Sequence, residues 1–373
     1  MTSMGQVYRY SNRFHQAIGL EDALGKRVFG TNDIVRRLAV ISSNRVFINN
    51  YPISNPAAVF NPAIVVEGDY ARIYARIIVG YFLYVSAIVE INVPLEDIYS
   101  GNANINYYSA EPVIYPSIRY DIWGTEDPRA YSIDGRLLLT YTGRTVNYYN
   151  PAIRIERTIP VTAERYRSNR WANGWRKIHV YKLPHDLSRH VVSDKDAFLV
   201  KHNGLYYLFH RPHMDDEVYY LVISRVDGEK DLFRNDLKQP MEITVKDTVE
   251  ILRPAGFEEK IGWAMPPIRI GGDRLIAFIH AVDREIKAYR LFAVEIELKR
   301  DEVIVTAVTP TYIMEPRDPY EIFGDRPYTI FPCGLWRVDN SYLVSYGAAD
   351  YVVGIGELDI EALHGFLDKG RIY

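Results

Sequence analysis

The chain has 373 residues, of which 48% are hydrophobic, so it can bury a large core; its length predicts two or three domains unless a repetitive architecture accounts for it. The formal net charge of -3 provides no broad basic surface, and we therefore expect neither nucleic acid nor a membrane as a partner. The single cysteine, Cys333, excludes an internal disulfide framework, and the N-terminal residues lack the apolar run of a secretory signal, so we expect a cytoplasmic protein.

Residues 1–50 are predicted to form an N-terminal extension that contributes a strand to the main fold. RLAVISSNRVFINN (37–50) has the composition of a strand, and we expect it to close a ring against the last of the repeats described below. Only EDALGKRV (21–28) near the start and DIEALHGFL (359–367) near the end resemble helices.

From residue 61 onward the chain shows a regular series of predicted β-hairpins. Each has two β-rich runs on either side of a two-residue turn of Gly, Asp or Asn. The first turn residues follow one another at intervals of 66 to 69, and the ends of the second strands keep intervals of 67 to 70. The five turns are Gly68-Asp69, Asp134-Gly135, Asn203-Gly204, Gly272-Asp273 and Asp339-Asn340.

A strand-rich repeat of this length, without helices between the strands, is typical of a β-propeller whose blades are small sheets around an axis. Five copies predict an all-β, five-bladed propeller that forms one domain over residues 1–373. A pair of unrelated β-sandwiches is the alternative, but it does not explain the constant spacing.

The repeat also predicts where the chemistry gathers. In an antiparallel hairpin the start of the first strand lies beside the end of the second. If the first strands lie near the axis, these positions meet at one mouth of the central channel, where we expect an active site. They carry Asn61, Arg76, Glu126, Asp127, Arg144, Lys195, Asp196, His210, Arg211, His280, Asp283 and Asp350.

The stretch GTEDPRAY (124–131) places two carboxylates side by side at this mouth. In an extended strand Glu126 and Asp127 point to opposite faces, so only one is expected to face the channel. Pro128 favours an extended backbone at Asp127, and Arg129 is placed to fix a carboxylate. A solvated Asp-Pro turn is the alternative for this motif taken alone.

The cations allow two interpretations. Arg76, Arg144 and Arg211 occupy equivalent places in three blades, where they form either blade-to-blade salt bridges or, with Lys195 and His210, an anion site. The histidines are equally compatible with the core, and their spacing predicts no metal site. Neither of the glycine-rich phosphate-binding loops, GxGxxG and GxxxxGK[ST], is present.

Several short motifs, in order, resemble those of glycoside hydrolase family 130. They are FNPA (60–63), GTEDPR (124–129), KDAFL (195–199), FHRP (209–212), KIGWAMPPI (260–268), HAVD (280–283), YRL (289–291), FPCG (331–334) and SYGAAD (345–350). The resemblance implies a five-bladed propeller and a β-mannoside phosphorylase or β-mannosidase. It makes Asp127 the proton donor, acting through a hydroxyl of the bound mannosyl unit.

The site residues carried by these motifs and by the repeat follow from the same resemblance. Asn61, Arg76, Glu126, Lys195, Asp196, Asp283, Tyr289 and Asp350 are expected to bind the sugar, and Arg144, Arg154, His210 and Arg211 the phosphate. No metal or cofactor is expected, since inorganic phosphate is the co-substrate of a phosphorylase. A homo-oligomer is compatible with the sequence.

The predicted reaction is the inverting phosphorolysis of a β-1,2- or β-1,4-linked manno-oligosaccharide, or of a mannosyl-glucose, to α-mannose 1-phosphate. The alternatives are an inverting β-mannosidase and a propeller that binds a glycan or protein without chemistry. The chain departs from the family pattern at 150–180, where Arg144, Arg154 and Arg157 are all possible phosphate ligands. Loops 165–175 and 212–218 are expected to select the acceptor sugar.

Overall fold

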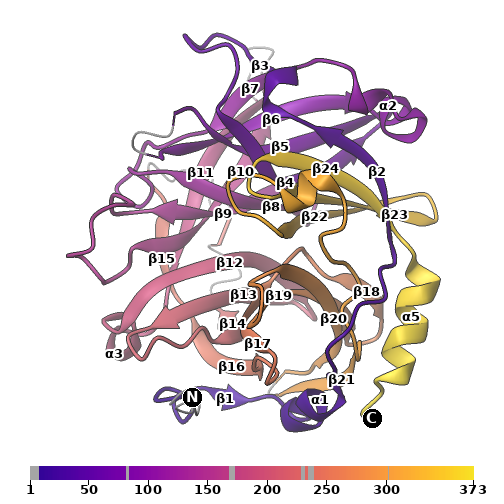
Figure 1. Ribbon diagram of the computed structural model, residues 1–373. Helices are drawn as coiled ribbons and strands as arrows, with labels where there is room; N and C mark the ends of the chain where they lie inside the picture. Colours follow the sequence, from indigo (N-terminus) through magenta and orange to yellow (C-terminus); the bar gives the residue numbers. More distant parts are fainter. Residues whose placement is uncertain (1–7, 81–83, 168–172, 228–231, 234–238, 301) are drawn as a thin grey trace.

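The structure is a computed structural model, and it describes residues 8–373 apart from 81–83, 168–172, 228–231, 234–238 and 301. Five sheets surround a common axis as a five-bladed β-propeller (Figure 1); their strands pair antiparallel, except that β1, β3 and β15 each join an outer edge in parallel. The fold class expected from the hairpin repeat is therefore confirmed.

The blades are numbered in chain order. Blade 1 holds β3 (Val46–Ile48), β4 (Ala58–Glu67), β5 (Tyr70–Ile78), β6 (Ser86–Pro94) and β7 (Tyr108–Ile114). Blade 2 holds β8 (Thr125–Ile133), β9 (Arg136–Arg144), β10 (Thr158–Arg167), β11 (Asn173–Lys182) and β15 (Met241–Thr244). Blade 3 holds β12 (Val191–His202), β13 (Leu205–Met214), β14 (Leu221–Val226), β16 (Lys246–Leu252) and β1 (His15–Gln16).

The last two blades complete the ring. Blade 4 holds β17 (Glu258–Trp263), β18 (Ile268–Gly271), β19 (Arg274–Asp283), β20 (Tyr289–Leu298) and β21 (Val303–Val308). Blade 5 holds β22 (Ile330–Val338), β23 (Ser341–Ala348), β24 (Val352–Leu358) and β2 (Val35–Ile41). The first strands of blades 5, 1, 2, 3 and 4 contact one another in that order around the axis, and blade 4 contacts blade 5 through β20 and β22.

All five predicted turns lie between the paired strands at the predicted residues. The turn at Asp134 and Gly135 shows why, because both residues have positive φ, 51° and 74°. Asn, Asp and Gly adopt this left-handed conformation most readily, and it matches the twist of the flanking strands. The residues of the turns therefore specify the hairpins locally.

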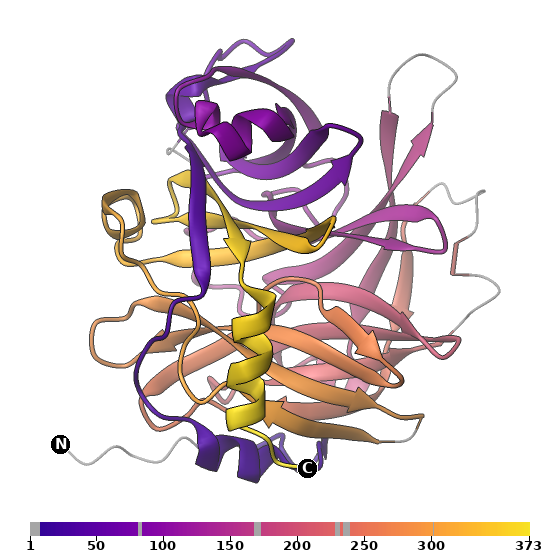
Figure 2. The ribbon, with the colours of Figure 1, turned by 90° about the vertical axis from the view of Figure 1, so that its right-hand side faces the viewer.

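The ring closes through pairing of the N-terminal segment with the last blade. β2 lies antiparallel to β24, with Ala39 opposite Ile355, whereas β3, from the later part of 37–50, pairs with β7 of blade 1. In Figure 1 the indigo β2 runs beside the yellow strands of blade 5. Figure 2 shows the same neighbourhood from the side.

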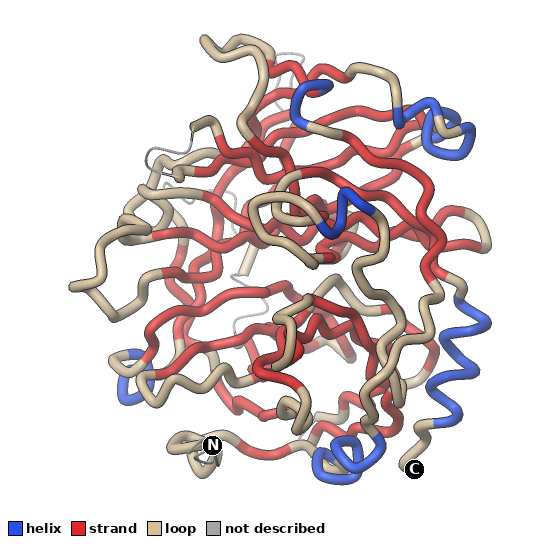
Figure 3. Tube along the Cα trace, in the orientation of Figure 1, coloured by secondary structure: helices blue, strands red, loops and turns tan. Residues whose placement is uncertain are grey.

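Apolar strands fill the space between blades. At the interface of blades 3 and 4, for example, the ring of Phe209 lies 4.9 Å from that of Trp263, which is fully buried. The short helices α1 (Leu20–Lys26), α2 (Leu95–Ser100), α3 (His185–Ser188) and α5 (Ile360–Lys369) lie at the periphery of the ring, whereas α4 (Pro319–Ile322) lies in front of the strands near the middle of the view (Figure 3). The chain also has two 3-10 turns, η1 (Ser43–Arg45) and η2 (Asn102–Asn104). Among the described residues, no helix is long and apolar enough to span a bilayer.

Candidate active site

The first strands of blades 1, 2 and 3 share an irregularity close to the axis. Their pairing register shifts between Phe60 and Ala63, between Glu126 and Arg129, and between Lys195 and Phe198. The bulges contain Asn61, Asp127 and Asp196, whose φ values are 46°, 50° and 56°. Asn and Asp tolerate this left-handed conformation better than other side-chain-bearing residues.

The bulge overturns two expectations about GTEDPRAY. Asp127 is left-handed rather than extended, so Pro128 does not hold it in a strand conformation. Because the bulge breaks the alternation of side chains, Glu126 and Asp127 both line the same cavity. The prediction that only one of them faces the channel is therefore wrong.

A cavity of about 340 Å³ lies where the five blades meet, and every blade contributes to its wall. Blades 1 and 2 supply Asn61, Arg76, Tyr84, Glu126, Asp127, Arg144 and Tyr148. Blade 3 supplies Ser193, Lys195, Asp196, Arg211 and Tyr219, while blades 4 and 5 supply Lys260, His280, Tyr289, Arg326, Thr329, Phe331 and Asp350. Six cationic side chains and four carboxylates therefore share one cavity.

Glu126 is held by three cations. Arg144 contacts both carboxylate oxygens, at 2.7 and 3.2 Å, Arg76 contacts Oε1 at 3.2 Å, and Lys195 contacts Oε2 at 3.1 Å. Burial would raise the pKa of Glu126, but Arg144, Arg76 and Lys195 outweigh it and hold the pKa well below its usual range. Glu126 is thus a permanently ionised anchor that ties blades 1, 2 and 3 together.

Asp127 is held differently, through one oxygen. Its Oδ1 accepts a hydrogen bond from Asn61 Nδ2 at 2.8 Å and one from Arg76 Nη1 at 3.0 Å. Among the described residues, none donates a hydrogen bond to its Oδ2. Gly347 makes this arrangement possible, since a Cβ at that position would collide with the side chain of Asn61.

Asp196 forms a second buried network with Arg129, Arg211 and His280. Arg129 Nη2 lies 3.2 Å from Oδ1, while Arg211 Nε and His280 Nε2 each lie 3.0 Å from Oδ2. Burial alone would raise the pKa of Asp196, yet Arg211, His280 and Arg129 hold it well below its usual range. Arg129 also donates to the backbone carbonyl of Asp127 at 2.8 Å, which fixes the bulge itself.

Arg211, Lys260 and Arg326 form a cationic group on the side of the cavity made by blades 3, 4 and 5. Burial and the neighbouring charges of Arg211 and Arg326 lower the pKa of Lys260 to about 8. Arg211 and Lys260 approach the ring of Tyr219 at 4.9 and 5.2 Å, and Arg326 lies 4.5 Å from that of Tyr289.

This cationic group is poorly satisfied by the protein. Among the described residues, neither the Lys260 ammonium nor the Arg326 guanidinium has a hydrogen bond or ion pair, and Nη1 of Arg211 is buried without a hydrogen-bond partner. Buried donors without partners cost free energy. That cost applies to Arg211, since Lys260 is half-buried and Arg326 is exposed; an anion bound between the three would satisfy Nη1 of Arg211 and pair with the other two charges.

Asp350 faces the same cavity from blade 5, at φ 51°. Burial raises the pKa of Asp350 to about 6, against the opposing effect of Arg326 and with a further increase from the negative charge of Asp127. It is the cavity carboxylate whose protonation changes close to neutral pH.

Three predicted site residues do not line the cavity. His210 is buried, with Nδ1 2.7 Å from Asp194 and Nε2 2.8 Å from the hydroxyl of Ser224. The side chain of Arg154 is 59% exposed and pairs with Glu217 at the surface. The placement of His210 and Arg154 therefore contradicts their expected role at the phosphate site, because one is enclosed in the blade and the other is turned to solvent.

Asp283 is the third of these residues. Its carboxylate accepts hydrogen bonds from the backbone of 285, 286 and 288 and pairs with Arg290 at 2.5 Å. Asp283 therefore shapes the turn that leads into Tyr289 instead of facing the cavity, which corrects its predicted role as a sugar ligand.

Arg157, the remaining candidate of the divergent segment, holds a loop. Its guanidinium donates to the backbone carbonyls of Asn147, Tyr148, Asn150 and Ile153. Of the arginines considered there, Arg144 is the one that lines the cavity.

Of loop 165–175, expected near the acceptor, residues 168–172 lie outside the described residues. Arg165 pairs with Glu67, at the far end of β4 from the bulge at Asn61, so this described residue of the segment lies away from the cavity. The other expected loop, 212–218, adjoins the cavity, since Tyr219 directly after it contributes to the wall.

The sequence interpretation missed Lys260 and Arg326 as cavity cations and Tyr84, Tyr148 and Tyr219 as cavity aromatics. Lys260 opens the KIGWAMPPI motif, so its position was visible. The others lie in segments that connect strands, where no repeat fixes the path of the chain.

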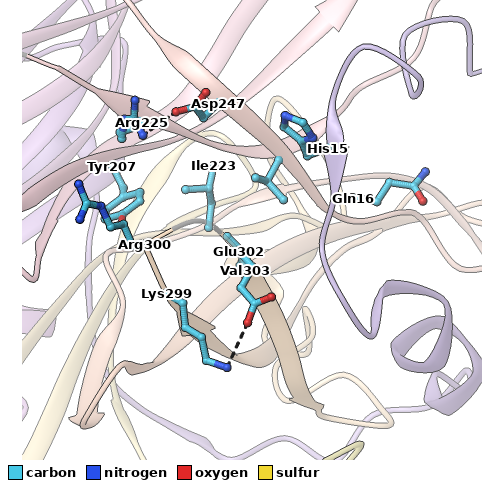
Figure 4. Close-up of a pocket in the computed structure, with 11 residues that line it drawn as sticks. His15, Gln16, Tyr207, Ile223, Arg225, Asp247, Lys299, Arg300, Glu302 and Val303 are labelled. Atoms are coloured by element: carbon cyan, nitrogen blue, oxygen red, sulfur yellow. Dashed lines mark hydrogen bonds and ion pairs between the residues drawn. The ribbon is translucent and has the colours of Figure 1, made fainter.

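A second hollow, of about 420 Å³, lies between blades 3 and 4 beside β1 (Figure 4). Its charged groups largely neutralise one another: Arg225 pairs with Asp247 at 2.7 Å, and Lys299 with Glu302 at 3.2 Å. None of the predicted site residues lies there. Among the described residues, no group of three His, Cys, Asp or Glu side chains is arranged to hold a metal ion.

Known proteins share the sequence pattern and the fold of this chain. Residues 25–369 match the model of the family described as beta-1,4-mannooligosaccharide phosphorylase. The chain belongs to glycoside hydrolase family 130. Two relatives of this family 130 protein come from Thermoanaerobacter sp. (strain X514): a β-1,2-mannobiose phosphorylase, 28% identical over 84% of this chain and 97% of its own, and a 1,2-β-oligomannan phosphorylase, 27% identical over 82% and 91%.

Solved structures share the fold. The β-1,2-mannobiose phosphorylase from Listeria innocua, in complex with β-1,2-mannobiose, superposes with a TM-score of 0.62 over 90% of this chain and 97% of its own, at 16% identity. A second structure, from the family's glycoside hydrolases that target β-1,2-mannosidic linkages in Candida mannan, gives 0.59 over 88% and 94%, also at 16% identity. At these identities the likeness concerns the propeller fold.

Proposed function

We propose that this family 130 protein is an inverting β-mannoside phosphorylase that releases α-mannose 1-phosphate. The observation that carries the proposal is that one cavity holds the carboxyl group of Asp127 together with Lys260 and Arg326, which have no hydrogen bond or ion pair among the described residues, and Arg211, whose Nη1 has no hydrogen-bond partner there. With all four cavity carboxylates ionised, the six cations still leave an excess of two positive charges, which favours an anionic co-substrate.

Asp127 supplies the proton. Asn61 and Arg76 both donate to Oδ1 and so fix the carboxyl group, while Oδ2 is left to carry the proton toward the substrate. In this family the proton passes through a hydroxyl of the bound mannosyl unit to the glycosidic oxygen. The bond between the anomeric carbon and that oxygen breaks, and the leaving sugar departs as a neutral alcohol.

Phosphate supplies the nucleophile. We place it against Arg211, Lys260 and Arg326, whose free donors match its oxygens. A phosphate oxygen attacks the anomeric carbon on the face opposite the leaving group, so the β-mannoside gives the α-phosphate. No carboxylate base is required, because phosphate is already a nucleophile.

Hydrolysis is the second candidate, and Asp350 is the observation that favours it. An inverting hydrolase needs a carboxylate to activate water, and the carboxyl group of Asp350, whose pKa is raised to about 6, lies in the cavity. The excess of cations over carboxylates in the cavity favours phosphorolysis over hydrolysis.

The deciding experiment incubates the protein with β-1,2- and with β-1,4-mannobiose, each with and without inorganic phosphate. We expect sugar phosphate only when phosphate is present, and phosphorus NMR should assign it to the α anomer. Free mannose in both tubes would establish a mannosidase, and binding without turnover a non-catalytic propeller. Because both Thermoanaerobacter relatives are named for β-1,2 linkages, we expect the β-1,2 substrate to react faster.

Matched variants test the roles of individual residues. Asp127→Asn should abolish turnover of mannobiose while the protein stays folded. Arg326→Gln should raise the KM for phosphate, whereas Arg154→Gln, a cation of the same type at the surface, should leave it unchanged. Equal effects of the two arginine variants would contradict the phosphate site.

A cytoplasmic location and a homo-oligomer belong to the same proposal. Phosphorolysis conserves the energy of the glycosidic bond in a sugar phosphate, which is useful where phosphate is abundant and the product is retained. Cell fractionation tests the cytoplasmic location, and sedimentation of the purified protein tests the homo-oligomer.

A further inference from the structure

Three tyrosines border the cavity on the side of blades 1 and 2, and we call them the tyrosine rim: Tyr84, Tyr148 and Tyr149. Tyr84 and Tyr148 line the cavity itself, and their ring centroids are 5.7 Å apart. The ring of Tyr149 follows at 5.4 Å from that of Tyr148. Tyr148 and Tyr149 are 51% and 60% exposed, so both rings are accessible to a ligand in the cavity mouth.

The loop that carries two of these tyrosines is held in place. Arg157 donates to the carbonyl of Tyr148 at 3.1 Å and to that of Ile153 at 2.6 Å, and Thr145 N–H donates to the carbonyl of Arg157 at 3.1 Å. Among the described residues, no carboxylate pairs with Arg157. The guanidinium is therefore committed to backbone carbonyls, and the exposed rings stand on a fixed loop rather than a free one.

The backbone of Tyr84 has a conformation that tyrosine rarely adopts. Its φ of 53° is left-handed, an uncommon conformation for a bulky residue, and one that surrounding contacts must stabilise. The Arg76 guanidinium lies 5.9 Å from the Tyr84 ring, and the Arg144 guanidinium lies 4.8 Å from that of Tyr148. The two arginines that fix the catalytic carboxyl region thus also support the rim.

Tyr148 and Tyr149, on blade 2, lie across the ring from Lys260 and Arg326, which come from blades 4 and 5. Arg211, Lys260 and Arg326 come from blades 3, 4 and 5, whereas the tyrosines and Asp127 come from blades 1 and 2. In an inverting displacement the nucleophile and the leaving group occupy opposite faces of the anomeric carbon. Phosphate on one side therefore directs the departing sugar toward the other.

We propose that the tyrosine rim is the acceptor subsite, in which Tyr148 stacks on the apolar face of the pyranose that leaves. This inference rests on the proposed phosphorylase function and deepens it. A sugar ring offers an apolar face to an aromatic ring and hydroxyls to the solvent, which suits half-exposed tyrosines.

The test uses the synthetic direction, with α-mannose 1-phosphate as donor and mannose as acceptor. Tyr148→Ala should raise the KM for the acceptor about tenfold, while the KM for mannose 1-phosphate changes less than twofold. Tyr148→Phe keeps the stacking ring and should stay within about threefold of the wild type for both substrates. Tyr70→Ala, which removes an equally exposed tyrosine at the hairpin turn of blade 1, is the control.

The outcomes separate the two proposals. If the wild type forms no sugar phosphate from mannobiose and phosphate, the proposed function fails before the rim is tested, and the acceptor subsite falls with it. If the wild type is active and Tyr148→Ala leaves the acceptor KM unchanged, the acceptor subsite alone is wrong. An equal rise of both KM values would show that Tyr148 acts through Arg144 as a structural support, which also overturns the inference.

Discussion

At the scale of single residues, the four carboxylates of the cavity differ in the groups that surround them. Glu126 and Asp196 are each surrounded by cations and are fixed as anions, so neither can donate a proton near neutral pH. Asp127 is fixed through one oxygen only, and Asp350 is buried with a raised pKa. Only the last two therefore have the freedom that acid-base chemistry requires.

The raised pKa of Asp350 predicts a pH-dependent stability difference. Its folded-state pKa of about 6 lies above the ordinary value of 3.8, so the folded protein binds this proton more tightly than the unfolded chain. The wild type therefore loses stability as pH rises from about 4 to 6. Relative to the wild type, Asp350→Asn should gain on the order of 3 kcal/mol between pH 4 and pH 7.5, measured by urea unfolding. A difference that is independent of pH would contradict the assignment.

The lowered pKa of Lys260 predicts an alkaline loss of phosphate affinity. Its ammonium loses charge as the pH rises through about 8, whereas a guanidinium keeps its charge. Between pH 7 and pH 9 the KM for phosphate should rise up to about tenfold more in the wild type than in Lys260→Arg. Comparing the two proteins at each pH removes the titration of phosphate itself. Parallel pH profiles would show that Lys260 does not bind the anion.

At the scale of elements, the strand bulges bring the functional side chains inward. Each bulge places an Asn or Asp in the left-handed region, where its side chain can leave the plane of the blade and enter the cavity. Close approach by glycines makes room for this. A Cβ on Gly262 would lie 2.5 Å from both Asp196 Oδ2 and His280 Nε2.

Gly347 allows a direct test of bulge geometry. Gly347→Ala should push Asn61 away from Asp127 and lower kcat about 10- to 100-fold, because small displacements of catalytic groups are costly. Gly365→Ala is the matched control: a Cβ there has no neighbour within 4 Å, and its helix should gain stability with activity unchanged. Full activity of Gly347→Ala would mean that the contact between Asn61 and Asp127 is dispensable.

At the scale of the whole molecule, the cavity exists only when the ring is closed. Each blade contributes lining residues, and the N-terminal β2 joins the last blade by pairing with β24. Side chains more than 200 residues apart, such as Arg76 and Asp350, therefore share one wall. Opening the ring anywhere should disperse the cations and separate them from Asp127.

A substitution at one buried side chain of β2, that of Ile41, should weaken the closure of the ring. Ile41 on β2 is fully buried, so Ile41→Ala should lower the free energy of unfolding by about 2–4 kcal/mol through the cavity it leaves. Ile53→Ala, at an exposed site, should change it by less than about 0.5 kcal/mol. In both variants, activity and tryptophan fluorescence should be lost at the same urea concentration. Activity that outlasts the fluorescence transition would contradict a site that depends on the closed ring.

The sequence by itself determined the blades, because a two-residue turn of Gly, Asp or Asn and two flanking β-rich runs specify a hairpin locally, and a constant interval repeats it. It also placed Asn61, Arg76, Glu126, Asp127, Arg144, Lys195, Asp196, Arg211 and Asp350 in the cavity, since the start and end of a hairpin keep their places in every blade, while Tyr289 came from the family resemblance.

Only the tertiary structure decided which side chains turn inward and what they meet there. His210 and Arg211 are neighbours at the end of the same strand. His210 faces the interior of the blade and Arg211 faces the cavity, because consecutive residues of a strand point to opposite faces. The bulge broke this same rule at Glu126 and Asp127, and the loops that bring Tyr148 and Arg326 to the cavity follow no repeat. Such placements depend on contacts between segments far apart in the chain, which local sequence pattern does not encode.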